Sequence, residues 1–383
     1  MTQGHGPTES RRAAQALPRG DHARPRSSAR RAFDIEPLGE ANQRAWEDAA
    51  HAMATTPFGH PGWTLAWWKA FGSGALHIAV LRRRGEVVGV IPLRQRGRRL
   101  HAPTNTESPL FEPLAADGDA AAELTRALLL RCPGGLVLAS VEPESGVTVG
   151  VLTAAAQARA RHLRRTVLRS PRLAVTGTWA DFEARLPAGR RQNLRRRRRR
   201  LEEAMGAVAL EVSDGSDRLA ADLDDGLRLE ASGWKSEAGT AILARATAAR
   251  FYRLLAREAS ARGWLRLAFL RAGDRRIAFD YCLEHDGVHY LLKTGFDEGL
   301  RPFGPGMLLR AEMVRRAHEQ AMCSYELLGN DDPWKQDWCS GVRERISLQV
   351  MSRTATGRVI WAAESFGRPL ARALLNTTIR RRG

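Results

Sequence analysis

Lysine is rare in this 383-residue chain, and its positions indicate where chemistry is expected. Of the 60 basic residues only four are lysine. Lys235 and Lys335 each follow a tryptophan, and Lys293 ends an apolar segment just before a glycine-rich stretch. Arginine fills the other basic positions, so we expect these lysines where a compact ammonium does what a planar guanidinium cannot. Binding of a substrate carboxylate or phosphate is one role, and packing of the lysine stem over the indole is the alternative.

A glycine-rich turn is the second candidate site. Residues Arg301–Gly306 (RPFGPG) follow a predicted strand and open a predicted helix. Glycine lets a phosphate approach the backbone closely, and a helix N-terminus adds a favourable dipole. Pro305 has no N–H, so four backbone amides are the expected donors to a pyrophosphate: those of Phe303, Gly304, Gly306 and Met307.

The composition favours an anionic partner and a protein without a membrane span. The net charge of +18 attracts nucleic acid, anionic lipid or a phosphorylated cofactor. The alternative is that the charge reflects an arginine-rich composition and has no specific partner. Apolar runs such as Val87–Ile91 fall far short of the roughly 20 residues that a transmembrane helix needs. No apolar segment follows Ser10-Arg11-Arg12, so we expect no signal peptide. The four cysteines have no metal-ligand spacing, which favours reduced thiols, a cytoplasmic location and no metal.

Hydrophobic periodicity predicts alternating helices and strands after a disordered basic tail, residues 1–32. Helices are expected at 40–53, 60–71, 115–131, 147–162, 178–186, 188–205, 216–232, 240–263 and 307–321. Strands are expected at 33–38, 134–142, 163–170, 287–294 and 323–328, with hairpins at 76–94 and 264–284 that turn at 84–85 and 272–274. Segments 344–353 and 357–363 are expected to close the sheet. The two half-chains repeat one order of elements, which suggests a duplicated α/β unit.

Several motifs in the second half resemble, in order, the BioF2-like/CelD group of GNAT-superfamily acyltransferases. They are LEASGWKSEAGTAI (229–242), the segment 251–287, HYLLKTGFDEGLRPFGPGMLL (289–309) and YELLGNDDPWKQDW (325–338). The resemblance covers about residues 176–345, and PFGHPGWTLAWWKAFG (57–72) is similar to the start of that group's first domain. The turn matches the R-x-x-G-x-G coenzyme A loop of this superfamily through Arg301, Gly304 and Gly306.

The resemblance implies a fold and a reaction. The expected fold class is α/β (α+β), with two tandem GNAT-like domains, each a mixed, mostly antiparallel sheet flanked by helices. The N-terminal domain is expected at 33–175 and the C-terminal acetyltransferase domain at 176–350, followed by a strand or helix and a basic tail at 351–383. The implied activity is N-acyl transfer from an acyl thioester, acetyl-CoA, to an amine on a small molecule or glycan precursor.

Acyl transfer needs a group that takes a proton from the amine and a donor to the oxyanion. Strand alternation predicts that Lys293 shares a face with His289 and Leu291, and a backbone N–H near Lys293 and Thr294 is the expected oxyanion donor. Asp280 interrupts the apolar segment IAFDYCL, so we expect it to face a cleft. The catalytic candidates are Glu230, Asp280, Lys293 and Asp297. The substrate-binding candidates are Trp234, Lys235, Asp331, Trp334 and Lys335.

The run of six arginines, Arg195–Arg200, leaves the donor open. On a helix, Leu194, Arg198 and Leu201 share one face, and Glu202 and Glu203 reduce the self-repulsion. One interpretation is a helix face that is exposed to solvent and has no binding role. The other is contact with nucleic-acid or coenzyme A phosphates. Two alternatives therefore stand beside acetyl transfer. They are a Fem-like transferase that uses aminoacyl-tRNA and a non-catalytic protein that binds polyanions on a GNAT scaffold.

Overall fold

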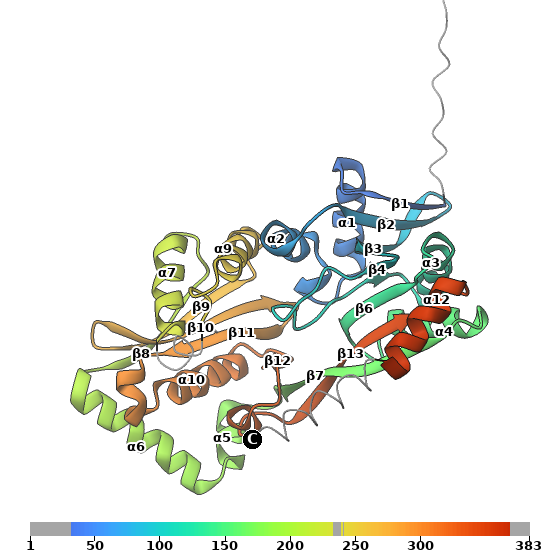
Figure 1. Ribbon diagram of the computed structural model, residues 1–383. Coiled ribbons are helices and arrows are strands. Elements are labelled where there is room, and N and C mark those ends of the chain that lie inside the picture. Colours follow the sequence, from blue (N-terminus) through green and yellow to red (C-terminus); the bar gives the residue numbers. More distant parts are fainter. Residues whose placement is uncertain (1–31, 233–238, 240, 368–383) are drawn as a thin grey trace, which may run out of the picture. The chain divides into compact units, whose positions relative to one another are not determined.

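The computed structural model describes residues 32–232, 239 and 241–367 (Figure 1). Predicted features at 1–31, 233–238, 240 and 368–383 lie outside this part of the chain. The described helices include no segment with both the length and the apolar character that crossing a membrane requires.

A single sheet runs through both halves of the described chain. Its order is β1-β2-β3-β4-β6-β13-β7-β12-β11-β10-β9-β8, and β5 pairs with β3 off this path. The N-terminal strands are β1 (Phe33–Pro37), β2 (Leu76–Arg83), β3 (Glu86–Arg96), β4 (Arg99–His101), β5 (Leu114–Ala115), β6 (Leu136–Val141) and β7 (His162–Ala174). The C-terminal strands are β8 (Val208–Ser213), β9 (Leu265–Ala272), β10 (Arg275–His285), β11 (Val288–Phe296), β12 (Ser324–Glu326) and β13 (Gly341–Val350).

The predicted duplication is visible in the strand directions. In the first half an antiparallel meander β2-β3-β4 is followed by α3 (Gly118–Arg131) and by β6, which is parallel to β4. In the second half β9-β10-β11 is followed by α10 (Pro305–Glu319) and by β12, which is parallel to β11. All other strand pairs are antiparallel, so the predicted fold class is confirmed.

The two halves share their central strands. β13, late in the sequence, lies between β6 and β7, and β7 in turn pairs with β12. The described residues of both halves accordingly form one compact unit by their contacts. The division into domains at residue 175 stays a prediction, because β7 and β13 carry the sheet from one half to the other.

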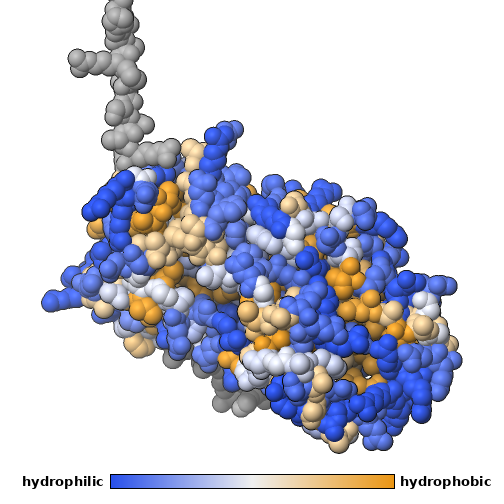
Figure 2. Space-filling model, turned by 180° about the vertical axis from the view of Figure 1, so that it is seen from behind, coloured by the Kyte–Doolittle hydropathy of each residue, from blue (hydrophilic) through white to orange (hydrophobic). Residues whose placement is uncertain are grey.

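Helices cover both faces of the sheet, as the amphipathic patterns predict. In the first half α1 (Glu40–Met53) covers one face, and α3 with α4 (Gly146–Gln157) covers the other. In the second half α7 (Leu219–Glu230) and α9 (Ala246–Ala261) pack on one face, joined by α2 (Pro61–Phe71) from the first half. α5 (Trp179–Arg185), α6 (Ala188–Met205) and α10 pack on the opposite face. The rear surface is mostly hydrophilic, with apolar side chains gathered in small areas (Figure 2).

Most predicted elements are confirmed, one is wrong, and one strand was not predicted. Residues 357–363 do not form a strand, because Thr354 caps the N-terminus of α12 (Ala355–Ala362) by accepting a hydrogen bond from the Gly357 N–H. β8 has no predicted counterpart, because its alternation is short and directly follows the arginine-rich helix α6. The turns at Arg84-Gly85 and Gly273 form as predicted, with positive φ at all three residues.

Candidate functional site

The sheet opens where β11 and β12 diverge. The parallel pair is held only from Val288 to Tyr290 on β11 and from Ser324 to Glu326 on β12. β11 continues to Phe296, and over these last residues β10 is its strand partner among the strands that the structure describes. A free strand edge presents backbone N–H and C=O groups, and here it borders a cavity.

A β-bulge lies at the start of this opening. Tyr281 of β10 is opposite Lys293, and Cys282 is opposite Leu291, so Leu292 is an extra residue in β11. A bulge interrupts the alternation of side chains, and it moves Lys293 to the face that carries Tyr290. The prediction that Lys293 shares a face with His289 and Leu291 is therefore wrong. Lys293 instead points to the side of α7 and α9.

Lys293 meets a buried carboxylate on that face. Its Nζ is 3.0 Å from Oε2 of Glu107, and it lies 5.5 Å from the centre of the Tyr252 ring. The Tyr252 hydroxyl also donates to Glu107 over 2.9 Å, and Arg245 is 2.8 Å from the other oxygen. Burial raises the pKa of Glu107, but the charges of Lys293 and Arg245 lower it by more, so it stays ionised. Glu107 comes from the loop between β4 and β5, and no sequence motif pointed to it.

A cavity of about 450 Å³ occupies the opening between β11, α10 and the segment after β12; we call it the β11–α10 cavity. It brings together Glu230, Arg301, Gly304, Gly306, Met307 and Trp334 of the predicted site residues. Its other walls come from Thr294–Phe296 at the end of β11, from Arg190 and Arg197 of α6, and from Trp338. Apolar walls beside a glycine turn and a free strand edge suit a long, thin ligand with a charged end.

The glycine turn donates fewer amides to this cavity than predicted. The Gly304 N–H donates to Arg301 O, and the Met307 N–H donates to Gly304 O, both over 3.0 Å. Phe303 does not line the cavity, and its ring packs against the core and below Arg200. Within the described part of the chain, the Gly306 N–H at the start of α10 is therefore the predicted donor left for a ligand, and Gly304 supplies the left-handed backbone (φ +66°) that the turn requires.

Asp280 does not face a cleft, contrary to the prediction. Its side chain is fully buried and forms an ion pair with Arg310 of α10 over 2.8 Å. Arg310 also donates to the Tyr325 hydroxyl and lies 5.7 Å from the Trp334 ring at the cavity wall. Burial lowers the pKa of Arg310, and Asp280, Tyr325 and Cys282 together raise it by more. Asp280 thus holds Arg310 in place between the sheet and α10.

Of the predicted catalytic residues, Glu230 is the one that lines the β11–α10 cavity. It ends α7, is 98% buried by residue area and lines the β11–α10 cavity, and its Oε2 accepts the Ile242 N–H over 2.8 Å. Gly295 of β11 makes this approach possible, because a Cβ there would lie 2.4 Å from the Glu230 Cα. The absence of a side chain at residue 295 thus brings the end of α7 against the free edge of β11.

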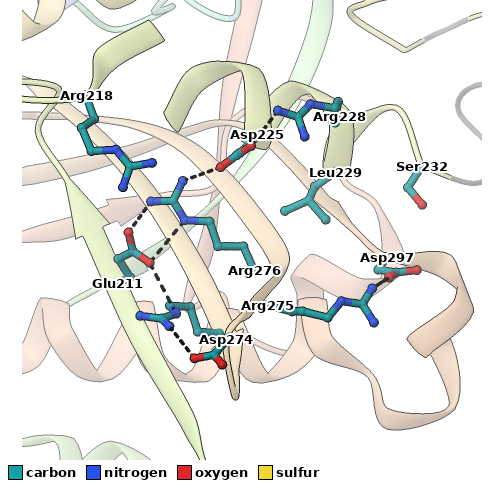
Figure 3. Close-up of a pocket in the computed structure, with 11 residues that line it drawn as sticks. Glu211, Arg218, Asp225, Arg228, Leu229, Ser232, Asp274, Arg275, Arg276 and Asp297 are labelled. Carbon is teal, nitrogen blue, oxygen red and sulfur yellow. Dashed lines mark hydrogen bonds and ion pairs between the residues drawn. The ribbon is translucent and has the colours of Figure 1, made fainter. Parts of the chain in front are cut away.

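Asp297 lies in a different cavity, of about 620 Å³, between α7 and the β9–β10 hairpin (Figure 3). Asp297 pairs with Arg275 over 3.0 Å and accepts the Gly299 N–H, so its oxygens are occupied. Arg276 pairs with Glu211, Asp222 and Asp225 in the same region. The charges of this cavity largely neutralise one another, which makes it a less suitable site for an acyl donor. Ser232 lines both cavities.

Lys335 stabilises a loop, and its ammonium has no N–H left to donate to a substrate. Its ammonium is buried and lies 2.8 Å from the carbonyl oxygens of Leu328 and Asn330 and 2.9 Å from Asp332. Trp334 is partly exposed at the cavity, whereas Asp331 does not line it. Trp234 and Lys235 lie outside the described residues.

Comparison with known proteins identifies the type of domain. Residues 188–336 match the model of the acetyltransferase (GNAT) domain family. No curated protein matches the chain. FemX has the same fold at 11% identity with a TM-score of 0.55, covering 85% of this chain and 98% of FemX.

Two further solved structures share the fold. One is the C-terminal domain of a protein assigned as a lysylphosphatidylglycerol synthetase of Agrobacterium fabrum, with 13% identity and a TM-score of 0.51, covering 88% of this chain and 96% of that one. The other is a conserved protein of Bacteroides thetaiotaomicron, with 12% identity and a TM-score of 0.53, covering 83% and 99%. The chain thus contains a GNAT acyltransferase domain, and the residues that line the β11–α10 cavity fall within the matched range except for Asp337 and Trp338.

Proposed function

We propose that this protein transfers an acyl group from coenzyme A, most simply an acetyl group, to an amine on a small molecule or glycan precursor. We place it in the BioF2-like/CelD group on the motifs of its second half. The observation that carries the proposal is the opening of the sheet at Leu292–Phe296 next to the glycine turn. An extended thioester donor fits this opening with its phosphates at α10 and its carbonyl at the free edge of β11.

The residues around the end of β11 take different parts in the proposed chemistry. A backbone N–H at the bulge of β11, near Leu292 and Lys293, would donate to the thioester oxygen as charge develops there. The amine lone pair attacks the carbonyl carbon, the C–S bond breaks, and the thiolate leaves with the bonding electrons. Of the predicted catalytic carboxylates, which are Glu230, Asp280 and Asp297, Glu230 lines the β11–α10 cavity, and we assign it the acceptance of the amine proton. Lys293 and Glu107, on the side of α7 and α9, would position the acceptor.

Thermal unfolding in the presence of candidate donors tests this proposal. Acetyl-CoA and CoA should raise the Tm of the wild-type protein, and Gly306→Glu should abolish the shift because it places a carboxylate at the phosphate end of the cavity. Gly39→Glu is the matched control, since a side chain at Gly39 would meet no other atom within 4 Å. Salt-sensitive stabilisation by tRNA without any response to CoA would favour the Fem-like donor instead. No response to either ligand would favour the non-catalytic scaffold.

Glu230→Gln tests the assignment of the base. We expect it to lower kcat by about 100-fold, in line with the contribution of general-base catalysis, while the Tm shift with CoA is retained. Asp297→Asn is the comparison, because Asp297 lies in the other cavity. Equal losses in both variants, or none in Glu230→Gln, would remove Glu230 from the mechanism.

A further inference from the structure

The run of six arginines on α6 reaches the β11–α10 cavity through one member, Arg197. We propose that Arg197 binds a phosphate ester of the acyl donor, together with the Gly306 N–H and the N-terminus of α10. This inference rests on the proposed function and identifies the residue that recognises the donor's charged end.

The other arginines of the cavity are already neutralised. Arg190 pairs with Asp337 over 2.6 Å, and Arg301 pairs with Glu298 over 2.6 Å. Arg310 pairs with the buried Asp280 over 2.8 Å. A guanidinium that is satisfied by a carboxylate contributes little net attraction to an incoming phosphate, so these three leave the cavity wall close to neutral.

Arg197 differs from them because its partners are neutral. Its Nε donates to Asn193 Oδ1 over 3.0 Å, and its Nη1 donates to the carbonyl of Pro302 over 2.8 Å. Within the described part of the chain it forms no ion pair with a carboxylate. Two of its five N–H groups are used, and the guanidinium is held in a fixed orientation with an uncompensated positive charge.

The guanidinium of Arg197 lies directly on the glycine turn. A Cβ at Gly304 would be 2.9 Å from its Nη1. The amides of Gly304 and Met307 are used inside the turn, so the backbone offers an anion mainly the Gly306 N–H. One free amide and a helix dipole are a weak anion site, and a fixed guanidinium next to them supplies the missing charge and donors.

The other arginines of the run either pair with carboxylates or lie away from the cavity. Arg198 pairs with Glu202 and Glu312, Arg199 with Glu203, and Arg195 with Glu183. Arg196 and Arg200 do not line the cavity. Arg197 lies three residues after Leu194 and four before Leu201, both of which are buried, so helical spacing turns it toward the core side of α6.

Calorimetric titration of the full-length protein with CoA, dephospho-CoA and pantetheine tests the proposal. Arg197→Gln should weaken CoA binding about tenfold or more, the loss of a charged hydrogen bond, and leave pantetheine binding unchanged. Arg199→Gln makes the same charge change on the exposed side of α6 and should alter CoA binding less than about twofold. Arg197→Lys keeps the charge without the fork and should bind CoA with intermediate affinity. Thermal unfolding of each variant, measured in parallel, reports whether the fold is retained.

The outcomes separate this inference from the proposed function. If wild-type protein does not bind CoA, the proposed function fails first. If wild-type protein binds CoA and Arg197→Gln binds it as well as Arg199→Gln does, the role of Arg197 is wrong while the proposed function stands. If Arg197→Gln weakens CoA but not dephospho-CoA, the ribose phosphate is the ligand group, and if it weakens both equally, the pyrophosphate is. Loss of tRNA binding alone in Arg197→Gln would overturn the coenzyme A assignment.

Discussion

The ammonium of Lys293 and the carboxylate of Glu107 lie 3.0 Å apart, on segments from opposite halves of the chain. Lys293 is next to the bulge of β11, and Glu107 lies on the loop between β4 and β5. The first half of the chain thus reaches the strand at which we place the thioester. The charge of Lys293, in the second half, is therefore balanced by Glu107, a residue of the first half that belongs to no sequence motif.

Glu107→Gln should destabilise the fold by about 3 kcal/mol, because it removes the buried carboxylate that pairs with Lys293 and Arg245. Chemical unfolding followed by tryptophan fluorescence measures the change. Glu123→Gln is the control, since Glu123 pairs with Arg83 at the surface and should cost less than about 1 kcal/mol. Similar losses in the two variants would show that the Glu107 cluster behaves as a surface pair.

Lys335→Met should lower stability by about 2 kcal/mol, because the carbonyls of Leu328 and Asn330 lose their buried donor. Any rise in the acceptor KM should be accounted for by the loss of folded protein, since each N–H of the Lys335 ammonium already has a partner within the protein. Lys69→Met removes an exposed lysine and serves as the control in the same unfolding experiment. A stable Lys335→Met variant with a raised acceptor KM would restore the substrate-binding role.

Gly295→Ala should destabilise the fold by about 1–3 kcal/mol, because its Cβ would overlap the backbone of Glu230 and push α7 away from β11. Gly189→Ala meets no neighbour and lies inside α6, so it should be neutral or slightly stabilising. Comparing the two Tm values tests the close approach. An unchanged Tm for Gly295→Ala would contradict it.

Stability should fall in mild acid through His60. Burial and the charges of His285, His51 and Arg262 lower its pKa to about 4, although the nearby Asp286 acts to raise it. The unfolded chain, with a histidine pKa near 6.5, therefore binds the proton first as pH falls. The neutral form stabilises the fold fully above pH 6.5, and about 3 kcal/mol is lost by pH 4.

Urea unfolding between pH 7 and pH 4 measures this dependence. His60→Gln should lose less stability over the range than wild type, because it has no imidazole to protonate. His162→Gln changes an exposed histidine and should follow the wild-type curve. Parallel curves for all three proteins would assign the acid sensitivity to other groups.

The sequence alone determined the elements and their order. Amphipathic and alternating patterns placed α1, α2 and the two hairpins, since burial of one face leaves a local periodic signal. The repeated order predicted two similar units, and the glycine turn lies at the start of α10 where its strand-to-helix position put it. These features depend on residues that are close in the chain.

Only the tertiary structure decided which side chains meet. A single extra residue at Leu292 moved Lys293 to the other face, and neither propensity nor alternation indicates a bulge. Asp280 was predicted at a cleft but pairs with Arg310, whose position depends on how α10 packs on the sheet. Glu107 and Arg197 gave no local signal, one being a lone carboxylate and the other one of six identical neighbours. Their roles follow from long-range packing, because charge pairing in a folded chain depends on distance in space rather than on spacing in the sequence.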